Sequence, residues 1–256
     1  MTPRRFALAG LVALALGVQP LIARAATEAP APPEQPWSFD GLFGTYDLAS
    51  AQRGYQVYAQ VCSACHGLSH LAYRHLGDLG YSADQVSALA SQFTVTAGPD
   101  ANGDMFERPA VPADTFKEPF PNKAAAQAAN GGAYPPDLSV FVEARAGGAD
   151  YLDALLTGYH EPPAGVEVRP GLYYNTYFPG HQIAMPPPLQ EGIIEYTDGT
   201  PATVDQMSHD VTMFLTWASE PNLETRKQMG LKVILYLIVL TGLLYATKRK
   251  LWSSLH

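Results

Sequence analysis

The 256-residue sequence contains only two cysteines, Cys62 and Cys65. This scarcity leaves room for at most one disulfide and argues against a zinc site built from several thiolates. No repeat of fixed period runs through the chain, so solenoid and propeller architectures are not expected. Basic residues are also scarce, because residues 28–224 hold all 24 acidic side chains but only seven Lys or Arg, a formal charge of −17. That charge repels nucleic acid and attracts cationic partners, unless it serves solubility alone.

The two ends of the chain are apolar in different ways. Residues 1–25 combine Arg4 and Arg5 near the start, a short apolar run and Ala-Arg-Ala at the end, which is typical of a secretory signal peptide; an N-terminal anchor is the alternative. The segment 229–247 has a single charge, Lys232, and is followed by the basic residues 248–250. This pattern predicts a transmembrane helix with a short cytoplasmic tail. A helix over residues 222–250 is long enough to cross a bilayer and stand above it.

Both cysteines belong to the motif Cys62-Ser-Ala-Cys65-His66. A disulfide or a thioredoxin-like site would leave His66 unexplained, and the βαβ pattern of thioredoxin is missing. Covalent haem attachment uses all three side chains, since the two thiols meet the vinyl groups and the imidazole binds the iron. The motif therefore predicts one haem c, attached through Cys62 and Cys65 and ligated by His66.

Two helices are expected in the domain that carries this motif. Residues 47–67 have apolar side chains at helical spacing, and Asp47 or Ser50 could cap the helix. This helix would hold the haem-binding segment rigidly. Residues 203–219 form a second amphipathic segment, opened by a capping box at Thr203.

The ligand on the other face of the iron is not given by the motif. The candidates are the methionines at 105, 185, 207, 213 and 229 and the histidines at 70, 75, 160, 181 and 209. Met185 is favoured because Pro186, Pro187 and Pro188 follow it and stiffen the chain, although a proline run can also be a linker. His181, in the same loop, is its strongest histidine rival. A His/Met pair raises the reduction potential and closes the iron, which favours electron transfer over oxygen or peroxide chemistry.

Several longer blocks resemble the cytochrome c1 family, and the resemblance runs from Trp37 to the C-terminal anchor. The blocks are Trp-Ser-Phe-Asp-Gly-Leu-Phe-Gly (37–44), Arg-Gly (53–54), Cys-Ser-Ala-Cys-His (62–66), Ala-Ala-Asn-Gly-Gly (128–132), Tyr-Pro-Pro-Asp-Leu-Ser (134–139), Leu-Leu-Thr-Gly-Tyr (155–159), Leu-Tyr-Tyr-Asn (172–175) and Met-Pro-Pro-Pro-Leu (185–189). The haem motif is common to all c-type cytochromes, whereas the two proline-rich blocks are far more specific.

The resemblance implies the role of individual residues. His66 and Met185 would be the axial ligands, and Arg145 and Tyr151 match positions that contact the haem propionates in the family. A buried propionate is well served by a bidentate cation and a hydroxyl. An ordinary surface ion pair is the alternative for Arg145. Some bacterial relatives brace the loop before the methionine with a further cysteine pair, which this chain lacks, so packing and proline stiffness must hold it.

The resemblance also implies a function. A chain of this family is the haem-c subunit of ubiquinol–cytochrome c reductase, and does no substrate chemistry of its own. It accepts electrons from a Rieske iron–sulfur protein and passes them to a soluble, basic c-type cytochrome; cytochrome b and the lipid bilayer are its other partners. The alternatives are a haem-c subunit of another membrane complex, such as a terminal oxidase, and an open-site haem sensor or peroxidase.

The expected fold is mainly α: a cytochrome c-like helical domain with long loop insertions and one C-terminal transmembrane helix. We expect a signal peptide over 1–25, a periplasmic cytochrome c domain over 26–225, and an anchor with a short cytoplasmic tail over 226–256. The chain would cross the inner (cytoplasmic) membrane once.

Overall fold

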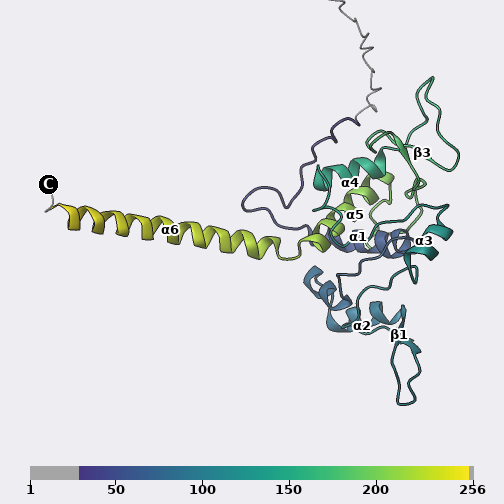
Figure 1. Ribbon diagram of the computed structural model, residues 1–256, viewed down its shortest axis with the longest axis horizontal. Coiled ribbons are helices and arrows are strands. Elements are labelled where there is room, and N and C mark those ends of the chain that lie inside the picture. The colour runs from purple at the N-terminus through teal and green to yellow at the C-terminus, as the bar shows by residue number, and fades with distance from the viewer. Residues whose placement is uncertain (1–28, 254–256) are drawn as a thin grey trace, which may run out of the picture.

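The computed structural model describes residues 29–253, so the expected signal peptide lies outside the described residues. Figure 1 shows a head of short helices and long loops, from which a single long helix projects. The mainly α fold with one C-terminal helix able to span a membrane is therefore confirmed.

The regular elements are short except for the last two helices. The helices are α1 (Leu48–Gln60), α2 (Ala83–Ser91), α3 (Lys123–Ala129), α4 (Gly148–Thr157), α5 (Val204–Ser219) and α6 (Leu223–Trp252), with 3-10 turns at Cys62–Ala64 and Tyr73–Leu79. Two antiparallel hairpins pair β1 (Thr94–Ala97) with β2 (Phe106–Pro109) and β3 (Tyr173–Tyr174) with β4 (Gln182–Ile183).

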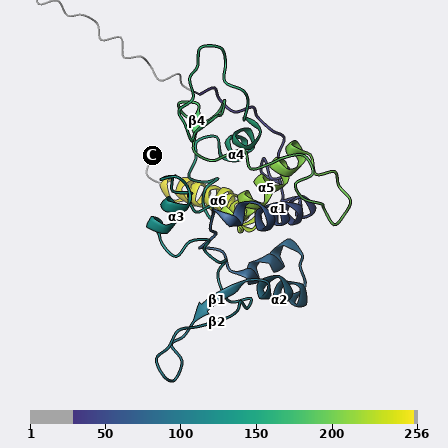
Figure 2. The same ribbon diagram turned by 90° about the vertical axis from the view of Figure 1, so that its right-hand side faces the viewer.

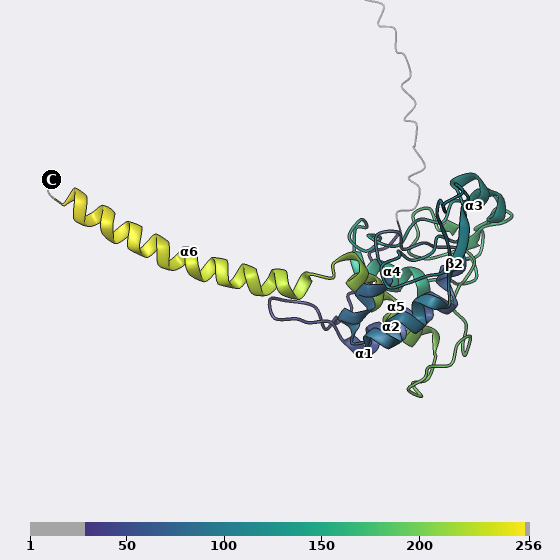
Figure 3. The same ribbon diagram turned by 90° about the horizontal axis from the view of Figure 1, so that it is seen from below.

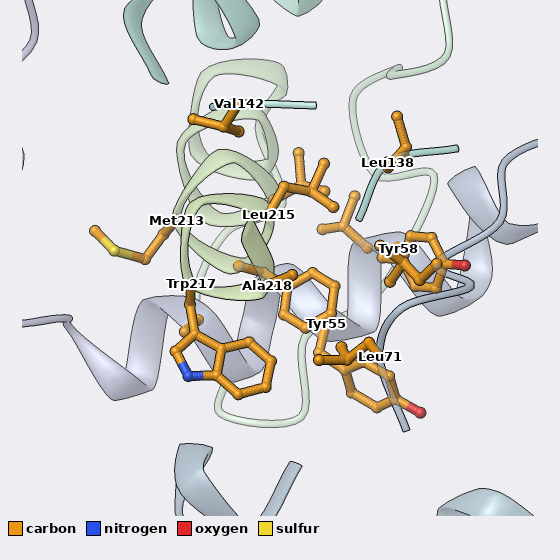
Figure 4. Packing of buried hydrophobic residues seen from close by; sticks show 14 of the residues in the cluster. Tyr55, Tyr58, Leu71, Leu138, Val142, Met213, Leu215, Trp217 and Ala218 are labelled. Atoms are coloured by element: carbon orange, nitrogen blue, oxygen red, sulfur yellow. The ribbon is translucent and has the colours of Figure 1, made fainter. Parts of the chain in front are cut away.

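The core of the head is formed where α1 packs on α5, as Figure 4 shows. At Gly54 the helices are so close that a Cβ atom would overlap the main-chain carbonyl of Asp210 and come within 2.7 Å of the Phe214 Cβ atom. Tyr55 and Tyr58 place their rings 5.6 and 5.8 Å from the ring of Phe214. The missing side chain at Gly54 therefore allows the aromatic side chains of the two helices to pack together.

The remaining elements lie around this helix pair. Figure 2 shows α4 and β4 on one side of α1 and α5, and α2 with the β1–β2 hairpin on the other. Figures 1 and 3 place α3 at the end of the head opposite α6. The head thus has one end next to the projecting helix and one end far from it.

Two details of the expected helices are wrong. The helix expected over 47–67 ends at Gln60, although Asp47 caps it as predicted, accepting bonds of 3.0 and 3.3 Å from the N–H groups of residues 49 and 50. In α5, Thr203 accepts a bond of 3.1 Å from the N–H of Gln206, but the reciprocal bond of a capping box is not formed. The Gln206 side chain instead donates to Asp210 at 3.0 Å, because a buried carboxylate needs donors more than an exposed N-cap does.

Asp210 is the buried charge that joins α5 to α1. Its carboxylate is fully buried and accepts two bonds from Arg53, at 2.8 and 3.1 Å, and one from Ser50 at 2.6 Å. Burial by itself raises the pKa of Asp210, but the hydrogen bonds from the surrounding side chains outweigh it and bring the pKa down to about 2. The ion pair therefore stays charged at neutral pH and fixes the register of the two helices.

The helix α6 makes almost no contact with the head beyond its first turns. Of its 30 residues only Leu223 is buried, and its most apolar 18-residue window has a mean hydropathy of 2.0 and is not buried at all. At about 1.5 Å per residue the helix is roughly 45 Å long. An apolar helix that leaves its surface uncovered is suited to a bilayer as its partner.

Candidate functional site

The haem motif lies just after α1, in a tight turn rather than in the helix itself. Cys62–Ala64 form a 3-10 turn, and the N–H groups of Cys65 and His66 both donate to the Cys62 carbonyl, at 3.1 and 2.9 Å. The two cysteines are not bonded to each other. Burial, with a smaller effect of Cys65, raises the pKa of Cys62 to about 12. A raised pKa does not favour a thiolate redox centre at Cys62.

His66 is held by hydrogen bonds to its ring and to its main chain. Its Nδ1 atom lies 2.7 Å from the carbonyl oxygen of Pro136, so Nδ1 carries the proton and Nε2 keeps its lone pair. Burial lowers the pKa of His66, which keeps the imidazole neutral and able to bind a metal. The main chain is fixed as well, because the Tyr58 hydroxyl donates to the His66 carbonyl at 3.1 Å.

The proline-rich block 134–139 forms the wall that carries the Pro136 carbonyl. Asp137 accepts bonds of 2.8 Å from the N–H groups of Ser69 and Ser139, and the N–H of Leu138 donates to the Gly67 carbonyl at 2.9 Å. The block is thereby tied to the residues that directly follow the motif. The sequence alone indicated no role for Pro136 or Asp137.

Met185 follows the β3–β4 hairpin, which brings it back against the core. Its main-chain carbonyl accepts a bond of 3.1 Å from the hydroxyl of Tyr159, and its side chain is partly buried against the hydrophobic cluster. The hairpin is anchored by Asn175, which is fully buried. The Asn175 side chain donates to the Leu155 carbonyl at 2.8 Å and accepts from the N–H groups of residues 177 and 178, at 3.0 and 3.1 Å. These bonds brace the hairpin before Met185 in a chain that has no further cysteine pair.

Four of the rival candidates differ from Met185 in their surroundings. Met207 and Met213 are buried on the α5 helix, and Met105 is 60% exposed just before β2. His181 takes a backbone φ of 58° in the turn of the hairpin. Its ring stacks on Tyr174 at 5.7 Å, and its Nδ1 lies 3.3 Å from the carbonyl oxygen of residue 175. Met185 remains the predicted ligand.

Arg145 and Tyr151 lie close together around the start of α4. Arg145 is exposed, its guanidinium lies 5.0 Å from the centre of the Phe141 ring, and within residues 29–253 it has no ion-pair partner. Burial raises the pKa of the Tyr151 hydroxyl, and the nearby charge of Arg145 opposes that rise. An unpaired guanidinium beside a partly buried hydroxyl is a suitable partner for a carboxylate such as a haem propionate. The binding of a propionate by Arg145 and Tyr151 stays a prediction.

A polar cavity of about 210 Å³ opens beside Cys65, on the side of the motif facing α3. Its wall includes Gly67, Glu118, Lys123 and Asp137, but neither axial candidate. It is also smaller than the roughly 300–1,000 Å³ of pockets that hold drug-sized ligands. We therefore do not assign the haem to this cavity; it shows instead that the motif and α3 lie at the same end of the head.

Comparison with known proteins agrees along almost the whole chain. The sequence model of the Cytochrome C1 family matches residues 37–255. Cytochrome c1 of Rhodospirillum rubrum is 49% identical over 237 residues, covering 86% of this chain and 87% of that protein. The potato protein "Cytochrome c1-2, heme protein, mitochondrial" is 51% identical over 224 residues, covering 87% and 86%. "Cytochrome b/c1" of Bradyrhizobium diazoefficiens is 48% identical over 91% of this chain, which spans only 37% of that longer protein.

Proposed function

Because the chain belongs to the cytochrome c1 family, we propose that it is the haem-c subunit of a ubiquinol–cytochrome c reductase and transfers single electrons at a membrane. It accepts an electron from a Rieske iron–sulfur protein and passes it to a soluble, basic c-type cytochrome. Haem c, when bound, supplies the one-electron centre. No bond to quinol is made or broken by this chain, so its residues act by holding and orienting that centre.

The observation that carries this proposal is the hydrogen bond between His66 and Pro136. Because the Nδ1–H of His66 donates to the Pro136 carbonyl oxygen at 2.7 Å, the imidazole has one orientation and its Nε2 atom is free to bind a metal. Cys62 and Cys65 lie on the same turn and supply the two thioether links. A ligand fixed in this way reorganises little when the charge on the iron changes, which suits electron transfer.

Met185 would supply the second protein ligand to the iron when haem is bound. The Tyr159 hydroxyl and the β3–β4 hairpin hold the backbone at Met185, and three prolines follow it. A thioether ligand raises the reduction potential and leaves no open position for oxygen or peroxide. Arg145 and Tyr151 are available to bind the propionates.

The arrangement of the head supports a position between membrane and soluble partners. Cys65 and α3 line one cavity, and α3 lies at the end of the head opposite α6 (Figure 1). The haem-attachment turn therefore lies away from the membrane end, where a soluble protein can reach it. The charge of −17 over residues 28–224 attracts a basic partner. The basic residues 248–250 support a cytoplasmic tail and a periplasmic head. In this proposal cytochrome b lies beside the anchor.

The test is a redox titration of the membrane-bound complex, followed by its absorption spectrum, with and without an inhibitor of the quinol site. We expect a c-type haem that quinol reduces only when the inhibitor is absent. Reaction with a basic c-type cytochrome should slow as salt is added, while reaction with a small uncharged oxidant should not. If the rate of reaction with the basic cytochrome does not depend on ionic strength, the proposed docking is ruled out.

Two outcomes would point to the alternative functions. If the chain purifies with oxidase subunits and without a b-type cytochrome and a Rieske protein, it serves another membrane complex. If carbon monoxide binds the reduced native protein, the site is open and a sensor or peroxidase role gains support.

A further inference from the structure

The loop of residues 38–45 is a compact structure with an apolar tip. The N–H of Thr45 donates to the Ser38 carbonyl at 3.0 Å and closes the loop at its base. Its tip carries Leu42 and Phe43, whose exposed fractions are 53% and 78%. Phe43 is the most exposed of the large hydrophobic residues that the structure describes. A closed loop that presents two apolar side chains to the outside needs a partner for them.

The loop is fastened to the first turns of α6. The ammonium group of Lys227 donates to the carbonyls of Phe39 and Gly44, and the carboxylate of Glu224 accepts from the N–H of Tyr46 at 2.9 Å. The Tyr46 hydroxyl also donates to the Glu220 carbonyl, at 2.9 Å. The loop and the start of the anchor therefore move as one body.

The tip lies at the level where α6 becomes apolar. Leu42 and Phe43 line a small groove together with Gln228 and Leu231 of α6. The apolar stretch of that helix begins at residue 229. Figures 1 and 3 show the loop beside the start of α6, reaching from the head in the direction in which the helix projects. When α6 crosses a bilayer, Leu231 is at the surface of the membrane on the side of the head, and so is the loop tip.

We propose that the loop tip, residues 41–44, inserts into the boundary between lipid headgroups and acyl chains, as a second membrane contact beside α6. Leu and Phe are side chains that suit this depth. The patch is continuous with the membrane-spanning surface of α6. It consists of two side chains, far less than the roughly 800 Å² that each partner buries in a stable protein interface, so a lipid surface is favoured over a protein. Two contacts on one rigid body fix the tilt and height of the head above the bilayer.

The experiment uses the full-length, haem-loaded chain in vesicles of phosphatidylcholine and phosphatidylglycerol. The two native cysteines are both taken up by the haem, so Phe43→Cys introduces a single thiol for a nitroxide spin label. Collisions with oxygen, which dissolves in lipid, and with a water-soluble nickel chelate are then measured by electron paramagnetic resonance. Val166→Cys is the matched control, because Val166 is an exposed apolar residue (41%) in the segment before β3, away from α6. Leu235→Cys, on α6, marks the bilayer itself.

We expect the oxygen-to-nickel collision ratio at residue 43 to be several-fold higher than at residue 166 and to approach that at residue 235. Equal ratios at residues 43 and 166 would overturn the proposal. The same labels in the complete complex, in the same vesicles, separate lipid from protein. If the label at residue 43 is shielded from both oxygen and the nickel chelate in the complete complex, a neighbouring subunit covers the loop tip. That result would also overturn the proposal. An unchanged haem spectrum shows that each variant is folded.

Discussion

The side-chain amide of Asn175 donates a hydrogen bond of 2.8 Å to the main-chain carbonyl of Leu155, and this contact ties the hairpin before Met185 to the α4 helix. The same side chain accepts two main-chain bonds from the turn that follows it. One buried residue thus connects the helix carrying Tyr151 to the loop carrying the predicted iron ligand.

Asn175→Ala should loosen the Met185 loop. Removing the side chain leaves the Leu155 carbonyl and two N–H groups without partners, at a cost of about 1–3 kcal/mol in the free energy of unfolding. Carbon monoxide should then bind the reduced protein more readily than it binds the unaltered chain. Gln190→Ala, an exposed site, is the control. Unchanged stability and unchanged carbon monoxide binding would show that Asn175 does not hold the loop.

Met185→Ala should open the iron to external ligands and lower the reduction potential, because the thioether is lost. Carbon monoxide binding and a redox titration measure the two effects. Met105→Ala, at a methionine that is 60% exposed before β2, should change neither. A Met185→Ala protein with the original spectrum and potential would mean that another side chain is the ligand, and His181→Ala would then be the next variant to test.

Asp210→Asn should destabilise the head by roughly 3 kcal/mol, because it removes the buried carboxylate and leaves Arg53 with only the exposed carboxylate of Asp198 as an ionic partner. The pKa of Asp210 falls from its ordinary 3.8 to about 2 on folding, so the charged form stabilises the fold above pH 3.8. That contribution is lost as the pH falls through about 2. Thermal unfolding in detergent, followed by circular dichroism of the haem, should show the difference between the two proteins shrinking over this range. A constant difference would contradict the assignment.

Gly54→Ala should destabilise the packing of α1 against α5 by roughly 3 kcal/mol, since the added methyl group overlaps the α5 backbone. Gly77→Ala is a matched control, because a Cβ atom there would have nothing within 4 Å. Thermal unfolding of both variants checks the prediction. Equal melting temperatures would mean that the two helices can separate without cost.

The sequence by itself determined the cofactor chemistry, because the thiols and the imidazole that haem attachment needs are adjacent at Cys62, Cys65 and His66. It also determined the anchor, because a run of apolar residues followed by basic ones needs no tertiary partner to be recognised. The positions of α1, α5 and α6 followed from their apolar side chains, except that α1 ends early at Gln60, whereas α2, α3 and α4 were not predicted.

Only the tertiary structure decided how the site is held. The bond from His66 to Pro136 joins residues 70 positions apart, and Arg53 reaches Asp210 over 157 positions. No local pattern predicts such pairs, because they depend on which helices and loops pack together. The position of the apolar loop tip at Phe43 also depends on tertiary structure. The bonds from Lys227 of α6 hold the loop beside the anchor, and the sequence does not reveal them.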